Sequence, residues 1–135
     1  MTAMNTPRNA TLKAGITVVG SGYLLTNDST NNKLDLTAAG EVALGVSLDE
    51  SERDASGLVA GGTVGYTPLG GVLMVASATG QTYTTGVAVY AGAGGLATAA
   101  SGGGVKKIGL YIGEGKTTSA DGDLIPVMTG ASVIA

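Results

Sequence analysis

The chain has 135 residues, a length typical of one domain, and contains 24 Gly but no Cys, His, Trp or Phe. Without Cys or His, disulfides, the usual ligands of most transition-metal sites and His-dependent catalytic triads are excluded. A net charge of −3 disfavours binding to a nucleic-acid backbone, and no apolar run approaches the ~20 residues that span a bilayer.

Charged residues make up only 13% of the chain, against about 25% in ordinary domains. The polar content consists mainly of Thr, Ser and Asn. Because a domain of this size usually carries more surface charge to stay in solution, the shortage indicates a surface that faces other proteins.

The first 13 residues show no hydrophobic periodicity and contain Pro7, Arg8 and Lys13. They also lack the charged-then-apolar order of a signal peptide. We expect an extended N-terminal arm, residues 1–13, that orders against a partner; a frayed terminus is the alternative.

From residue 14 to residue 135 the pattern predicts a single all-β domain. Short runs rich in β-branched and apolar residues alternate with clusters of Gly, Asn, Asp and Ser, which is typical of a small antiparallel barrel or sandwich. We expect strands within residues 17–19, 23–26, 41–44, 46–48, 63–66, 72–75, 86–90, 107–112 and 123–127. The charged segment 48–58 permits a helical turn but has no apolar face.

An internal similarity appears when the chain is shifted by 64 residues. The shift aligns Gly22 with Gly86 and Gly45 with Gly109, and a shorter loop then aligns residues 66–69 with residues 124–127, each containing a Pro. We therefore expect two related halves, about 14–75 and 76–135, in a barrel with approximate internal symmetry. Chance matches in a Gly-rich chain are the alternative.

Three segments resemble ligand sites without completing one. Residues 113–117 end like a P-loop, but Leu110 stands where the motif needs its first Gly. Residues 92–97 fit a dinucleotide fingerprint, but the segment after them cannot form the required helix. The acidic run 49–54 lacks the spacing of a calcium loop. We expect no metal, no cofactor and no enzymatic activity.

The order of several short motifs resembles that of bacteriophage capsid cement proteins, also called head decoration proteins. The motifs are Ala14–Gly20, Leu44–Leu48, Gly86–Ala91, Lys107–Tyr111 and Gly122–Val127. The resemblance covers most of the chain from Ala14 onward. The acidic segment after Leu48 and the Gly-rich residues 92–104 depart from it.

The resemblance implies a small β-barrel, β-tulip or jelly roll that binds the outer surface of an icosahedral phage head. Such proteins commonly form homotrimers at local three-fold positions and bridge subunits of the major capsid protein. They need no nucleic acid, membrane or cofactor. An arm that adds a strand to the capsid would place Thr6, Pro7, Arg8, Asn9 and Lys13 at the contact.

Deletion of residues 1–13 would then abolish binding to the head while the barrel stays folded. The alternative function is another virion module, such as a tail-tube, fibre or host-surface-binding β domain.

Overall fold

The computed structural model describes residues 7–28 and 30–130, which form an all-β fold with one short 3-10 turn, η1 (Ala93–Gly95). The first half contains β1 (Arg8–Thr11), β2 (Leu24–Asp28), β3 (Lys33–Leu36), β4 (Gly45–Ser47), β5 (Arg53–Asp54), β6 (Gly57–Leu58) and β7 (Thr63–Pro68). The second half contains β8 (Gly71–Ser77), β9 (Thr82–Tyr83), β10 (Ala88–Ala91), β11 (Ala97–Thr98), β12 (Lys106–Tyr111), β13 (Lys116–Thr117) and β14 (Asp123–Thr129). These residues contain no helix long and apolar enough to cross a membrane.

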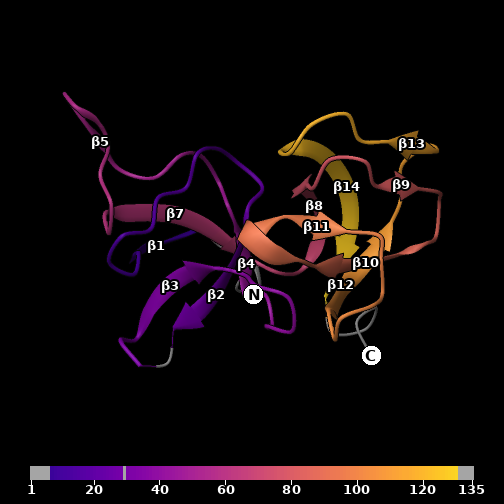
Figure 1. The fold of residues 1–135 in the computed structure, drawn as a ribbon, viewed down its shortest axis with the longest axis horizontal. Coiled ribbons are helices and arrows are strands. Elements are labelled where there is room, and N and C mark those ends of the chain that lie inside the picture. The colour runs from indigo at the N-terminus through magenta and orange to yellow at the C-terminus, as the bar shows by residue number, and fades with distance from the viewer. Residues whose placement is uncertain (1–6, 29, 131–135) are drawn as a thin grey trace, which may run out of the picture.

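The N-terminal half is a five-stranded sheet in the order β1-β7-β4-β2-β3, with antiparallel neighbours throughout. It lies beside the second half in Figure 1, in indigo to magenta. The sheet curves until its edge strands meet, where Leu12 and Leu34 form a parallel bridge. There the Lys13 N–H donates to the Leu34 carbonyl at 2.7 Å. The sheet is therefore nearly closed on itself.

The C-terminal half is a closed barrel in the order β10-β11-β8-β14-β12 (Figure 1). Its one parallel contact joins β11 to β8 at Ala97 and Ser77, and the Ala78 N–H donates to the Ala97 carbonyl at 2.9 Å. The all-β prediction is confirmed, and part of the architecture is a barrel. In each half one parallel contact thus joins the two ends of the strand order, at Leu12–Leu34 just after β1 and at Ala97–Ser77 at the last residue of β8.

Alternating side chains build the core, as the strand geometry requires. In β14, Ile125, Val127 and Thr129 are buried, while the alternate residues Leu124 and Met128 are exposed and Pro126 is half-buried. A stacked pair, Tyr83 and Tyr111, fills the barrel interior with ring centroids 5.2 Å apart. A second hydrophobic cluster fills the N-terminal sheet and consists of Leu12, Val18, Leu25, Leu34 and Val64.

The segment expected to be an arm belongs to the fold from Arg8 onward. β1 pairs with β7, with Arg8 opposite Tyr66 and Thr11 opposite Thr63. Leu12, just after the strand, is 0% exposed. Residues 1–6 lie outside the described residues. Deleting residues 1–13 is therefore expected to remove an edge strand and a core side chain, not to leave the domain intact.

The two halves share a hydrogen-bond pattern at the shift of 64 residues. In the first half the Gly22 N–H donates to the Ser47 carbonyl at 2.8 Å, and the Ser47 N–H donates to the Tyr23 carbonyl. In the second half the Gly86 N–H donates to the Tyr111 carbonyl at 2.7 Å, and the Tyr111 N–H donates to that of Val87. β2 and β4 therefore correspond to β10 and β12.

A second set of bonds repeats in the loops. The Ser51 Oγ accepts from the Val18 N–H at 2.9 Å, and the Ser51 N–H donates to the Val18 carbonyl. The Thr118 Oγ1 accepts from the Gln81 N–H at 2.9 Å, and the Thr118 N–H donates to the Gln81 carbonyl. The same loop geometry is thus built twice from different residues.

The structure corrects the expected alignment of the last strands. Gly45 lies opposite Pro68, and Gly109 lies opposite Thr129. Pro68 therefore corresponds to Thr129, and Pro126 has no proline counterpart in the first half. The first five-stranded set ends at Pro68 and the second begins at Gly71, several residues before the expected division.

Candidate functional site

The predicted capsid contacts are separated by the fold. Thr6 lies outside the described residues, and residues 7–9 are exposed at the edge of the N-terminal sheet. Lys13 instead forms an ion pair within the chain, with its Nζ 3.8 Å from Asp35 Oδ2. Residues 7–9 thus remain accessible to a partner, whereas Lys13 already has an acidic neighbour.

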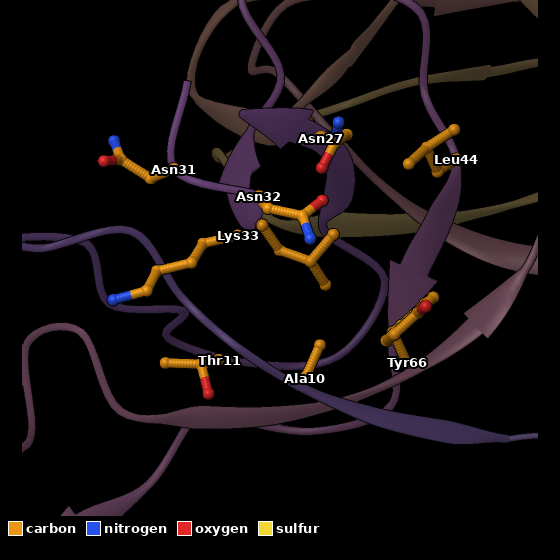
Figure 2. A pocket seen from close by; sticks show the side chains of 9 residues that line it. Ala10, Thr11, Asn27, Asn31, Asn32, Lys33, Leu44 and Tyr66 are labelled. Atoms are coloured by element: carbon orange, nitrogen blue, oxygen red, sulfur yellow. The ribbon is translucent and has the colours of Figure 1, made fainter. Parts of the chain in front are cut away.

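A hollow of about 430 Å³ lies between β1 and the β2–β3 hairpin (Figure 2). Its lining consists of Ala10, Thr11, Asn27, Asn31, Asn32, Lys33, Leu34, Leu44 and Tyr66. Figure 2 shows that Lys33 extends its ammonium group away from the centre of the hollow. This site could not be predicted from the sequence, because its lining comes from segments that only the strand order brings together.

The polar rim of the hollow is fixed by the β2–β3 turn. Asp28 accepts hydrogen bonds from the Asn31 side chain at 2.7 Å and from the Thr30 N–H at 3.2 Å. The Asn31 bond is the main reason why the pKa of the Asp28 carboxyl lies below its usual value. Asn32 adopts a positive φ of 56°, a conformation that Asn tolerates better than most residues. The turn thus presents amide groups at the mouth of the hollow.

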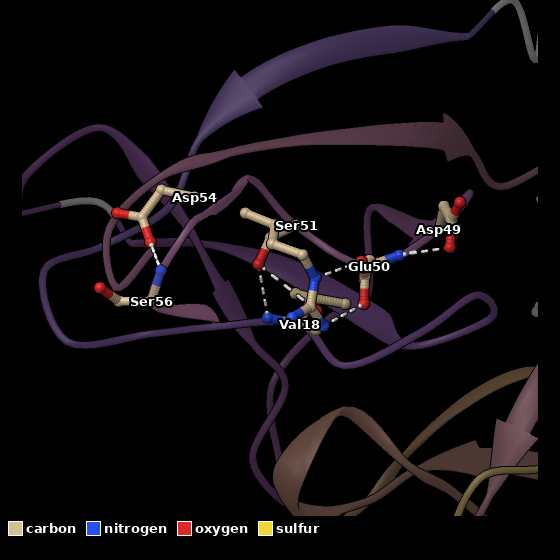
Figure 3. Close-up of polar contacts among 7 residues, drawn as sticks. Val18, Asp49, Glu50, Ser51, Asp54 and Ser56 are labelled. Carbon is tan, nitrogen blue, oxygen red and sulfur yellow. Dashed lines mark hydrogen bonds and ion pairs between the residues drawn. The ribbon is translucent and has the colours of Figure 1, made fainter. Parts of the chain in front are cut away.

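The acidic segment after Leu48 is a loop with a short hairpin, without the helical turn that its composition permits. Arg53 donates to both carboxylate oxygens of Glu50 at 2.9 and 3.0 Å, and this contact lowers the Glu50 pKa. Asp54 accepts from the Ser56 N–H (Figure 3). Each of these carboxylates has its own local partner. Across residues 7–28 and 30–130, no three metal-ligating side chains come together.

The two phosphate-site motifs form structures of other kinds. Residues 113–117 lead into β13, which pairs with β9 at Lys116–Tyr83, and Lys116 Nζ donates to the Leu124 carbonyl at 3.3 Å. Residues 92–97 contain η1 (Ala93–Gly95), which is three residues long, and the first residue of β11. Neither segment presents the N-terminus of an α-helix to a phosphate, which is the feature both motifs require.

An apolar face covers the outside of three neighbouring barrel strands. Val72 on β8 lies opposite Met128 on β14, which lies opposite Leu110 on β12. Val72 is 56% exposed and Met128 41% exposed. Met74 and Leu124 extend the same face along β8 and β14, because alternate residues of a strand point the same way. Exposed apolar patches of this kind mark protein–protein contact sites.

The comparisons with known proteins add no relative. No protein-family model matches this sequence, and no curated protein matches it significantly. The functional assignment therefore depends on the residues and geometry of the chain itself.

Proposed function

We propose that this chain is a structural virion protein that binds the outer surface of an icosahedral phage head. In this proposal it sits at local three-fold positions as a homotrimer and cements neighbouring subunits of the major capsid protein. The proposal follows from the ordered motifs that resemble capsid cement proteins. The all-β fold is compatible with it.

The observation that carries the proposal is the apolar face on β8 and β14. Val72 and Met74 are both large, exposed hydrophobics on β8, in a chain with few charges. Leaving such side chains in water costs roughly 25 cal/mol for each Å² of apolar surface, so covering them against another protein is favourable. A shell of many identical subunits offers a surface of that kind.

The test is co-sedimentation of the purified protein with expanded and with unexpanded phage heads. We expect binding to expanded heads and its loss in the double variant Val72→Ser/Met74→Ser. Val19→Ser is the matched control, because Val19 is 62% exposed but lies in the loop before β2. Failure of the unaltered protein to sediment with heads, or full binding by the double variant, would contradict the proposal.

A further inference from the structure

A small projection of the N-terminal half packs against the barrel. It consists of Gly22, Tyr23, Leu24 and Val46. The Gly22 carbonyl accepts a hydrogen bond from the Ala76 N–H at 2.8 Å, at the edge of β8. Gly22 has a φ of 85°, and a Cβ on it would lie 2.9 Å from the backbone nitrogen of Ala76, so a residue with a side chain would not fit there. We call these four residues the N-terminal knob.

The apolar side chains of this knob are covered by the barrel. Leu24 is 0% exposed and Val46 is 4% exposed, and both belong to the cluster that fills the barrel. The knob meets the barrel along β8, which pairs with β11 at its last residue, Ser77. An intramolecular contact thus joins the knob of one half to the part of β8 before Ser77, where β8 is not paired with β11.

In the N-terminal half, the hollow lies beside β1, the strand that corresponds to β8. β1 corresponds to β8, and Thr11 corresponds to Ala76, because Leu12–Leu34 and Ser77–Ala97 are the matching parallel contacts. The Leu12 N–H donates to the Gly62 carbonyl on the β7 side. Since successive N–H groups of a strand point in opposite directions, the Thr11 N–H points away from β7. Thr11 is exposed and lines the hollow.

The C-terminal half carries the matching knob, which the described residues cover only in part: Gly86 is exposed, and the other three residues are half-buried. Its residues at the shift of 64 are Gly86, Val87, Ala88 and Leu110, and Ala88 pairs with Leu110 as Leu24 pairs with Val46. Gly86 has a φ of 88° and Gly22 one of 85°. Gly86 is exposed, and no atom of the described residues beyond its chain neighbours lies within 4 Å of a Cβ built on it. We call these four residues the C-terminal knob.

We propose that the C-terminal knob of one copy of this chain docks in the hollow of a second copy, head to tail. The Gly86 carbonyl would accept a hydrogen bond from the Thr11 N–H of the next copy, as the Gly22 carbonyl does from Ala76 within the chain. The occupant is a second copy, because the chain itself supplies both parts of the contact. Within one chain the N-terminal knob already contacts β8, whereas the C-terminal knob and the hollow beside β1 have no such contact within the described residues.

Such a contact is heterologous, so it generates a ring if the rotation closes and a filament if it does not. The contact needs no capsid and therefore goes beyond the proposed function. The contact would also cover Leu110, which is half-buried, and Met128, which lies opposite it and is 41% exposed; their counterparts Val46 and Thr67 are buried in the first half.

The test uses two variants and their mixture, with mass measured by size-exclusion chromatography and light scattering in the absence of heads. Leu110→Asp disables the C-terminal knob, and Leu44→Arg fills the hollow. We expect the unaltered chain to form oligomers and each variant to be monomeric. An equimolar mixture should form a dimer of twice the monomer mass, because one intact knob then meets one intact hollow.

Val19→Asp is the control for added charge and should assemble like the unaltered chain. A monomeric unaltered protein, variants that keep its oligomeric mass, or a mixture that stays monomeric would each overturn the proposal. Circular dichroism confirms that the variants are folded. Should one lose its native spectrum, Met128→Asp replaces Leu110→Asp and Asn27→Trp replaces Leu44→Arg, with the same expected masses.

Discussion

Gly45 and Gly109 occupy the same place in the two halves, and neither position has room for a side chain. A Cβ on Gly45 would lie 2.4 Å from the Thr67 carbonyl oxygen, and one on Gly109 would lie 2.0 Å from that of Met128. In both halves the last strand passes directly over this glycine. Close approach of two backbones therefore explains why glycine recurs at the shift of 64 residues.

Replacing either glycine with alanine should destabilise the fold. Because the clash is with backbone, which cannot swing aside, we expect Gly45→Ala and Gly109→Ala each to lower the free energy of unfolding by about 1–3 kcal/mol. Urea denaturation provides the measurement. Gly102→Ala is the control, since a Cβ there meets no atom of the described residues within 4 Å. Equal midpoints for all three variants would refute the steric account.

Leu12 is expected to be essential for the N-terminal half. It is 0% exposed and follows the edge strand β1. Truncating a buried Leu to Ala costs about 2–5 kcal/mol, so Leu12→Ala should lower the urea midpoint clearly. Leu48→Ala, at a Leu that is 47% exposed, should change the free energy of unfolding by less than about 0.5 kcal/mol. Similar effects of both variants would show that the segment after β1 is not part of the core.

Leu24 and Leu25 are neighbours in β2, but their side chains pack in the cores of different halves. Both are 0% exposed, but Leu24 belongs to the cluster in the barrel and Leu25 to the cluster in the N-terminal sheet. Leu24→Ala should therefore speed amide hydrogen exchange in β8 and β12, whereas Leu25→Ala should speed it first in β4 and β7. Identical exchange patterns in the two variants would mean that the halves are not separate packing units.

Burial raises the pKa of the Tyr83 hydroxyl above its usual value of about 10, while its hydrogen bond with Ser77 at 2.7 Å partly opposes this shift. The unfolded chain therefore loses this proton first as the pH rises. The contribution of Tyr83 to stability is complete below about pH 10 and is lost as the pH rises through the folded pKa.

Tyr83→Phe should thus flatten the alkaline decline of the unfolding free energy, and Tyr90→Phe is the control that keeps the Tyr83 contribution. Near neutral pH, Tyr83→Phe should cost about 0.5–1.5 kcal/mol through the lost hydrogen bond. An unchanged alkaline decline would contradict the assignment to Tyr83.

Local pattern predicted several strands, among them β7, β8, β10, β12 and β14, but residues 17–19 and 41–44, which were also expected to be strands, form none although Val18 and Ala43 are buried. The alternation in residues 123–127 matches β14, whose odd-numbered side chains from Ile125 to Thr129 are buried. β1 (Arg8–Thr11) was missed because three of its four residues are polar and exposed, and its membership in the sheet depends on pairing with β7. Pairing between distant segments leaves no mark on the local sequence of either.

The hollow and the alignment of the last strands of the two halves could not be predicted from the sequence for a related reason. The similarity of Pro68 and Pro126 suggested that they correspond, but the strand register places Thr129 at the position of Pro68. Register depends on backbone hydrogen bonds, which residue identity does not encode directly. Likewise, Tyr66 and Asn27 meet across the hollow because β7 and β2 flank β4.

The covered N-terminal knob has a consequence during synthesis. Leu24 and Val46 are translated before Val75 and Ile125, which share their cluster in the finished protein. A nascent chain that has left the ribosome only as far as Pro68 therefore carries two bare apolar side chains with no barrel to cover them. Until β8 and β14 follow, this early half is a natural client for chaperones that hold hydrophobic segments apart.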